Sequence, residues 1–143
     1  MGDSINYKEW LRYAKKDYNL VRERFYIDSD FDLCCNSQQA LEKLFKAYLI
    51  KNDMRVPDSH DIHLLCKACA EKDENFNSFR RHSLFLSNYY FDKRYPYRNH
   101  MVNVEVNIDN VYKFLEQTFK YVEPLIDENL NDDLEFTNIF SRR

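Results

Sequence analysis

The chain has 143 residues, of which 44% are hydrophobic and 31% are charged, and its formal net charge is -3. This length can bury a real core, and the composition is that of a globular chain rather than a disordered one. The sequence has one glycine, Gly2. That excludes the glycine-rich loops that bind phosphates and dinucleotides, and it disfavours tight hairpins, so we predict an all-α protein.

Apolar side chains recur at alternating spacings of three and four residues, which is the period of an amphipathic helix. Helices are predicted over residues 5–26, 31–51, 59–71, 76–94 and 107–126. Four of them are long and the third is short. We therefore expect an up-and-down antiparallel helical bundle of four long helices plus one short helix. The bundle is assigned to residues 1–130, followed by an acidic then basic C-terminal tail over residues 131–143.

Short polar residues mark the expected helix starts. Asp3 or Ser4 can cap the first helix, and Asp58 or Ser59 can cap the third, because a side-chain oxygen accepts the free N–H groups of the first turn. A residue within 107–109 is expected to cap the fifth helix.

Proline and valine residues give further boundaries. Pro96 is expected to end the fourth helix, and Pro124 to kink or end the fifth, because proline lacks the helical N–H donor. Residues 101–106 alternate valine with polar side chains, which predicts an extended connector between these two helices.

The stretch from Asn88 to His100 holds the densest mixture of aromatic rings, arginines and histidine in the chain. Residues 80–100 carry five Lys or Arg and one carboxylate, whereas residues 123–136 carry six carboxylates and no Lys or Arg. A basic patch and an acidic tail on one small domain indicate either self-shielding or a charged partner.

All four cysteines fall inside apolar helical patterns: Cys34, Cys35, Cys66 and Cys69. The N-terminus lacks the apolar core of a signal peptide, and no apolar run approaches the length of a bilayer span. We therefore expect a cytoplasmic protein with reduced, buried thiols, no membrane contact and no cofactor.

Two further polar groups have a functional and a structural interpretation. His60, His63, Cys66 and Cys69 recur every three residues, but such steps drift around a helix, so core cysteines are favoured over a metal site. His60 and Asp61 form either a second polar site or part of a first helical turn, where Asp61 complements the helix dipole. Gln38 or Gln39 is expected to be buried and to bridge two helices.

An ordered series of residues resembles the HEPN domain, a family named for its occurrence in higher eukaryotes and prokaryotes and for nucleotide binding. The resemblance covers roughly residues 5–126. The series is Trp10, Ala14 and Asp17; Cys34; the run Gln38–Leu49; Pro57, His60-Asp61-Ile62 and Leu65; and Tyr90 with Arg94-Tyr95-Pro96.

The resemblance implies a helical bundle that often forms a homodimer and is often encoded beside a minimal nucleotidyltransferase as a toxin–antitoxin pair. Active family members carry a metal-independent ribonuclease site, made of an arginine, four to six residues and a histidine. Arg94 and His100, with five residues between them, match this spacing. The stronger form of the motif has a tyrosine two residues after the histidine, where this chain has Val102.

The chemistry of these residues suits RNA cleavage by the neighbouring 2′-hydroxyl. His100 would move a proton and Arg94 would stabilise phosphoryl charge. Further contacts to a phosphate or nucleotide would come from Lys93, Tyr95, Tyr97 and Arg98. In the structural alternative, Arg94 caps the fourth helix and His100 is an exposed loop histidine.

Three functions stay open at this point. The first is a ribonuclease-type toxin acting through Arg94 and His100. The second is a bundle whose basic-aromatic loop binds a nucleotide or partner phosphate without cleavage. The third is a structural partner of a nucleotidyltransferase that uses the exposed face of the fourth helix.

Overall fold

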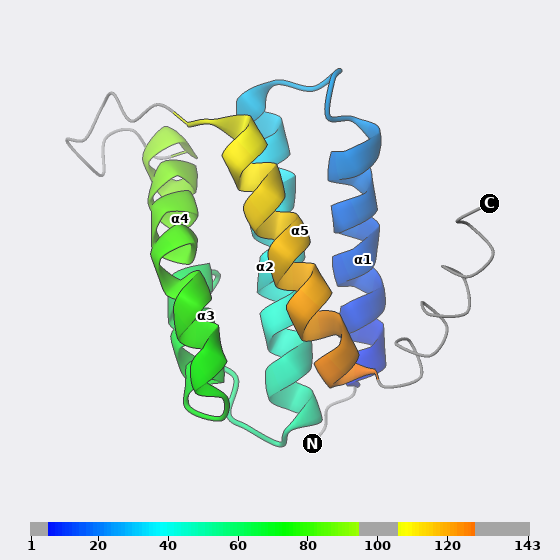
Figure 1. The fold of residues 1–143 in the computed structure, drawn as a ribbon, viewed down its shortest axis with the longest axis vertical. Helices are drawn as coiled ribbons and strands as arrows, with labels where there is room; N and C mark the ends of the chain where they lie inside the picture. The colour runs from blue at the N-terminus through cyan, green and yellow to red at the C-terminus, as the bar shows by residue number, and fades with distance from the viewer. Residues whose placement is uncertain (1–5, 95–105, 128–143) are drawn as a thin grey trace.

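The computed structural model describes residues 6–94 and 106–127, with the side chains of residues 92–94 left out. The predicted all-α fold is confirmed. Successive long helices alternate in direction, as the colour order along the chain shows (Figure 1). The elements are α1 (Tyr7–Glu23), α2 (Asp30–Lys51), α3 (Ile62–Ala70), the 3-10 helix η1 (Glu74–Phe79), α4 (Arg80–Arg94) and α5 (Ile108–Ile126).

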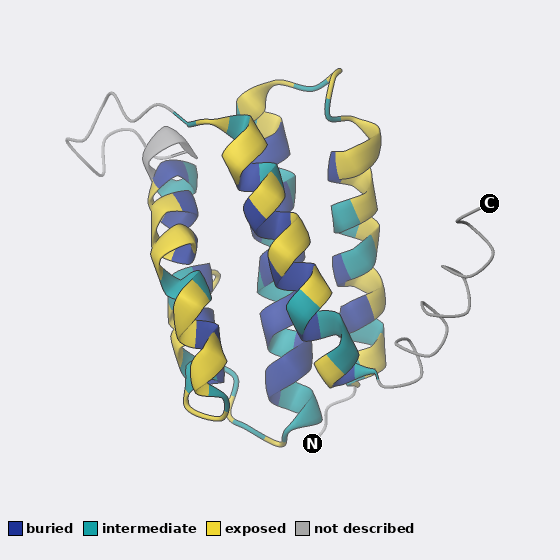
Figure 2. Ribbon diagram, in the orientation of Figure 1, coloured by how far each residue is buried: buried dark blue, intermediate teal, exposed yellow. Residues whose placement is uncertain are grey.

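The central element of the bundle is α2. It packs against α1, α3, α4 and α5, so it has neighbours on almost every side. In Figure 1, α1 lies at one edge and α4 at the other, with α5 crossing in front of α2. Twelve of the 22 residues of α2 are buried, and little of this helix is coloured as exposed in Figure 2. The central helix thus fixes where the surface helices sit.

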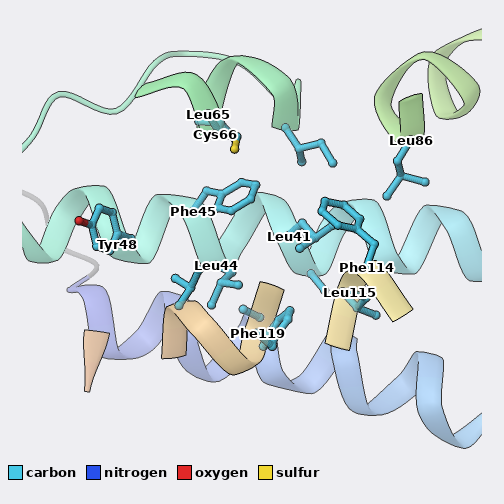
Figure 3. Close-up of a cluster of buried hydrophobic side chains, with 14 of the residues drawn as sticks. Leu41, Leu44, Phe45, Tyr48, Leu65, Cys66, Leu86, Phe114, Leu115 and Phe119 are labelled. Atoms are coloured by element: carbon cyan, nitrogen blue, oxygen red, sulfur yellow. The ribbon is translucent and has the colours of Figure 1, made fainter. Parts of the chain in front are cut away.

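Side chains from four helices meet on α2 to form the core. Leu41, Leu44 and Phe45 of α2 are fully buried, and Figure 3 shows side chains of α3, α4 and α5 pointing at this row. Each such burial stabilises the fold by roughly 1.5–3 kcal/mol. Phe76 of η1 adds an aromatic contact to Phe45, with ring centroids 6.1 Å apart.

Two of the expected helix caps are wrong, and the third is confirmed. Asn6 caps α1 in place of Asp3 or Ser4, and its side chain accepts hydrogen bonds from two backbone N–H groups. Asp61 caps α3, accepting from the backbone N–H of His63 at 2.9 Å. The helix begins later than expected because Pro57 and Ser59 precede it in a turn, in which the backbone N–H of Ser59 donates to the carbonyl of Pro57. Asn107 caps α5 as expected.

The fourth and fifth helices also differ from their predicted form. The expected continuous helix over 76–94 is divided into η1 and α4, because Asp73 caps the earlier turn by accepting from the N–H of Asn75. Pro124 does not end α5, which continues to Ile126. A proline in the last turn removes one helical donor but leaves the preceding turns intact.

Three regional predictions lie mostly or wholly outside the described residues. They are the extended connector over 101–106, the tail over 131–143 and the loop that follows Arg94. Within the described ranges, no helix combines the length and the apolar character that a bilayer crossing requires.

Candidate functional site

The candidate site begins where α4 reaches Arg94. This C-terminal end of α4 lies at the same end of the bundle as the start of α5 (Figure 1). Lys93 and Arg94 therefore belong to the last turn of α4. The four remaining candidate residues lie outside the described part of the chain: Tyr95, Tyr97, Arg98 and His100.

Buried contacts hold α4 against the bundle. Leu86 and Tyr89 are buried, and the Tyr89 ring lies 6.4 Å from the ring of Phe31 at the start of α2. The hydroxyl of Ser87, also buried, donates a hydrogen bond of 2.8 Å to Asp61 Oδ1. These contacts fix the direction of α4 and so the position of its Arg94 end.

Asp61 is thus a structural junction between two helices. Its Oδ1 atom accepts both from the backbone N–H of His63 and from the hydroxyl of Ser87, which ties the start of α3 to the middle of α4. Asp61 is therefore structural, but it caps α3 and does not lie in the first turn of the helix as expected. The sequence could not reveal it, because Ser87 lies 26 residues away.

His60 lies beside Asp61 but faces a different helix. Its Nδ1 atom is 2.8 Å from Glu42 Oε2, which also accepts from Lys46 Nζ at 2.8 Å. The His60 side chain is 80% exposed, whereas Glu42 is 14% exposed. Glu42 therefore holds an exposed imidazole in place through one of its ring nitrogens.

Gln38 confirms the expectation of a buried glutamine that bridges helices. It is 1% exposed, and its Nε2 atom donates a hydrogen bond of 2.7 Å to the backbone carbonyl of His60. The bond ties the middle of α2 to the residues just before α3. Gln38 and Glu42 together position the His60 backbone and side chain.

The four cysteines are buried free thiols, as predicted. Burial raises the pKa of Cys66 to about 11 and that of Cys34 to about 12. The thiol of Cys66 donates to the carbonyl of Phe76, and that of Cys69 to the carbonyl of Phe45. High pKa values and backbone partners make these thiols poor nucleophiles. Within residues 6–94 and 106–127, no group of three or more metal-ligating side chains occurs.

A surface groove between α4 and the start of α5 was not predicted from the sequence. Its volume is about 230 Å³. It forms because both helices pack on α2 rather than closely on each other. Its lining includes His82, Phe85, Leu86, Asn107, Asn110 and Phe114.

The comparison with family models decides the relationship. Residues 7–128 match the HEPN domain model. The chain belongs to the HEPN family. Searches of curated proteins and of solved structures returned no significant match.

The HEPN match spans the whole described bundle and the positions of Arg94 and His100. The resemblance in the sequence is therefore confirmed at the level of family and fold. Pairing with a nucleotidyltransferase, RNA binding and cleavage are finer statements, and we treat them as proposals.

Proposed function

We propose that this HEPN protein binds RNA through its basic-aromatic stretch and cleaves it with Arg94 and His100. The observation that supports this most is the position of Arg94 in the last turn of α4, at the bundle end where α5 begins. Pro96 follows two residues later and disfavours a further regular turn. A chain that turns back here can bring His100 towards Arg94, which six positions on one helix would not do.

The proposed reaction is an internal transfer within RNA. His100 accepts the proton of a 2′-hydroxyl, and the 2′-oxygen then bonds to the adjacent phosphorus. The bond from phosphorus to the 5′-oxygen breaks, and this oxygen takes a proton from water. The products are a 2′,3′-cyclic phosphate and a free 5′-hydroxyl. Arg94 stabilises the negative charge on the phosphoryl oxygens.

The remaining residues of the stretch serve binding in this proposal. Lys93 and Arg98 contact phosphates, and the rings of Tyr95 and Tyr97 stack on bases. The same contacts would bind a nucleotide without cutting it. Val102, in place of the family's tyrosine, favours this second function.

The wider setting belongs to the same proposal. We infer a cytoplasmic homodimer that acts in a pair with a minimal nucleotidyltransferase. Light scattering on the purified chain measures the first inference, and co-purification with the product of a neighbouring gene measures the second. A monomer at micromolar concentration would contradict the homodimer.

The test of cleavage compares histidine variants in the presence of a chelator. Wild-type protein should cut RNA, and His100→Ala should lower the rate by about 10²–10⁴-fold, the usual contribution of a general base. His60→Ala is the matched control, because His60 is an exposed histidine that lies outside the basic-aromatic stretch. Cleavage that depends on His60 and not on His100 would place the chemistry beside Glu42 instead.

Cleavage that persists in both variants, or no cleavage by the wild-type protein, would contradict the proposed ribonuclease function. RNA binding that weakens in Arg94→Ala without any cleavage would support the binding function in its place. Liquid chromatography of the fragments identifies the cyclic phosphate end that the proposed reaction requires.

A further inference from the structure

The groove between α4 and α5 has an apolar floor and a polar rim. Leu86, Val111 and Phe114 are buried, whereas His82 and Phe85 are exposed. The Phe85 side chain is 42% exposed. A volume of about 230 Å³ leaves room for one flat heterocycle but not for a folded segment of protein.

Ring stacking crosses this groove. The imidazole of His82 on α4 lies over the ring of Phe114 on α5, with centroids 5.2 Å apart and planes inclined by 23°. Phe85 stands one turn further along α4 and has no ring or cation partner among the described residues. An exposed aromatic face beside a stacked pair is a surface on which a nucleobase can stack.

Two carboxamides lie at the start of α5. Asn107 caps the helix by accepting from the backbone N–H of Asn110, which leaves its NH₂ group available. The side chain of Asn110 is exposed and makes no hydrogen bond within the described residues. A carboxamide offers both a donor and acceptors, which is the pattern that base edges present.

Unpaired cations stand next to the groove. Arg80 and Arg81 line a second hollow with His63 and Asn77, and no carboxylate of the described residues lines this hollow or the groove. Arg80 donates to the side-chain oxygen of Asn77. Neither guanidinium is paired with a carboxylate in the described part of the chain.

Arg81 and Phe85 are four residues apart, so they share one face of α4 at about 5–6 Å between Cβ atoms. This separation is on the scale of one nucleotide. We call Arg80, Arg81, His82 and Phe85 the α4 surface. It combines a stacking ring with cations that have no carboxylate partner among the described residues, and it lies across the groove from the carboxamides of Asn107 and Asn110.

We propose that the α4–α5 groove holds one unpaired nucleobase of an RNA strand, stacked on Phe85, with its phosphate at Arg81. This inference rests on the proposed RNA function and gives it a second contact point. Phe85 precedes Arg94 by nine residues, or about 14 Å along the helix axis. The groove therefore anchors the strand away from the bond that is cut.

The test measures the affinity of a fluorescein-labelled oligoribonucleotide of eight residues by anisotropy. All proteins carry His100→Ala so that the RNA stays intact. Phe85→Ala and Arg81→Gln should each weaken binding about tenfold, because a stacked base or a phosphate contact is lost. Circular dichroism should show the same helix content in both variants, since both side chains lie on the surface.

Matched controls come from α1, at the opposite edge of the bundle (Figure 1). Tyr13 is 41% exposed, close to the value for Phe85, and Arg12 is an exposed arginine. Tyr13→Ala and Arg12→Gln should change the affinity less than twofold. Equal effects of α1 and α4 variants, or no RNA binding at all, would overturn the proposal.

Two further arms separate other occupants from RNA. Adenosine and uridine monophosphates should bind far more weakly than the oligonucleotide; equal affinity would assign the groove to a free nucleotide and overturn the RNA assignment. A change of oligomeric state in Phe85→Ala, with RNA affinity unchanged, would make the groove a protein interface and also overturn it.

Cleavage measured without the His100→Ala background separates this inference from the proposed function. Cleavage that needs His100 but not Phe85, with equal RNA affinity, would leave the proposed function standing and reject the groove. RNA affinity that depends on Phe85 in a protein that cuts nothing would support the groove and reject cleavage.

Discussion

The surfaces of α1 and α4 carry similar residue types in opposite arrangements. On α1, two of the cations lie beside acids: Arg12 pairs with Glu9, and Lys15 lies 3.7 Å from Glu123. Two of its rings also lie under its own arginines: Arg12 lies over Tyr13 at 4.8 Å, and Arg22 lies over Tyr18 at 5.2 Å. On the α4 surface, Arg81 and Phe85 have neither kind of partner among the described residues.

In the RNA proposal, local charge balance matters more than the net charge of the protein. A cation beside a carboxylate attracts a phosphate weakly, and a guanidinium over one face of a ring leaves only the other face for a base. The protein as a whole has a net charge of -3. Among the described residues, the α4 surface nevertheless offers cations without a carboxylate partner next to a ring without a cation partner.

The largest effect is expected where α4 begins. Phe76 is fully buried and contacts Tyr48 with ring centroids 4.6 Å apart. Phe76→Ala should lower the free energy of unfolding by about 3–5 kcal/mol, because it leaves a cavity beneath η1 and α4. Urea denaturation followed by circular dichroism measures this loss.

Phe85→Ala is the comparison. It should change the free energy of unfolding by no more than about 0.5 kcal/mol, as is usual for exposed positions. A large loss of stability in Phe85→Ala would show that Phe85 supports the fold. That result would contradict the distinction between the structural ring of Phe76 and the exposed ring of Phe85.

The second prediction concerns alkaline pH. Burial raises the pKa of Cys66 from 9.0 in a model peptide to about 11. The unfolded chain loses this proton first, so stability should fall as pH rises above about 9, and the loss should be complete near pH 11. A shift of this size corresponds to about 2–3 kcal/mol. Cys66→Ala should remove this part of the pH dependence in urea titrations.

Tyr18 gives the corresponding test on α1. Burial, with a smaller contribution from Tyr112, raises its pKa from 10.0 to about 12. Ionisation of Tyr18 should therefore begin to lower the free energy of unfolding about one pH unit above the point where Cys66 does. Tyr18→Phe should remove this loss. Coincident onsets in the two variants would contradict the assignment.

The third prediction compares two aspartates. Asp61 caps α3 and accepts from Ser87, so Asp61→Ala should lower the free energy of unfolding by about 1–3 kcal/mol. Asp17 of α1 pairs with Lys43 at 2.6 Å on a partly exposed surface, and Asp17→Ala should cost at most about 1 kcal/mol.

Denaturation curves of both variants decide the comparison. Equal losses would mean that the junction of α3 and α4 is no stronger than a surface ion pair. Ser87→Ala should reproduce part of the Asp61→Ala loss, and the two changes should be non-additive because they share one hydrogen bond.

The smallest effect is expected at Glu123 of α5, which lies 3.7 Å from Lys15 of α1. Burial raises the pKa of this carboxyl above its usual range, although Lys15 opposes the shift. The native state therefore holds the proton more tightly than the unfolded chain. The contribution of Glu123 to stability should fall as pH rises from the unfolded pKa through the higher folded pKa.

Glu123→Gln, which mimics the neutral carboxyl, should remove this dependence, so that the variant matches wild type at acid pH and is slightly more stable at neutral pH. Thermal unfolding between pH 4 and pH 7 measures the change. A large loss of stability at pH 7 would show instead that the pair of Lys15 and Glu123 holds α1 against α5.

The helices could be predicted because the spacing of apolar residues along each helix is a local pattern. Leu41, Leu44 and Phe45 revealed the central helix, and the order of family residues revealed HEPN. The cap at Asp61 was missed because Asp58 and Ser59 have equally good capping side chains, and only the turn before the helix decides between them.

The surface features were harder to predict, because they depend on pairs that are distant in sequence. Glu42 reaches His60 across 18 residues, and Phe114 meets His82 only after α4 and α5 have both packed on α2. A helical pattern shows which residues leave the core. It does not show which of them find a charged or aromatic partner.

The most direct test of the account is the place where RNA touches the protein. An oligoribonucleotide containing 4-thiouridine, crosslinked by light to the His100→Ala protein and digested with trypsin, gives a map by mass spectrometry. We predict crosslinks in the peptide over residues 82–93, which contains Phe85. Crosslinks confined to α1 peptides such as residues 17–22 would contradict the claim that the α4 surface binds RNA.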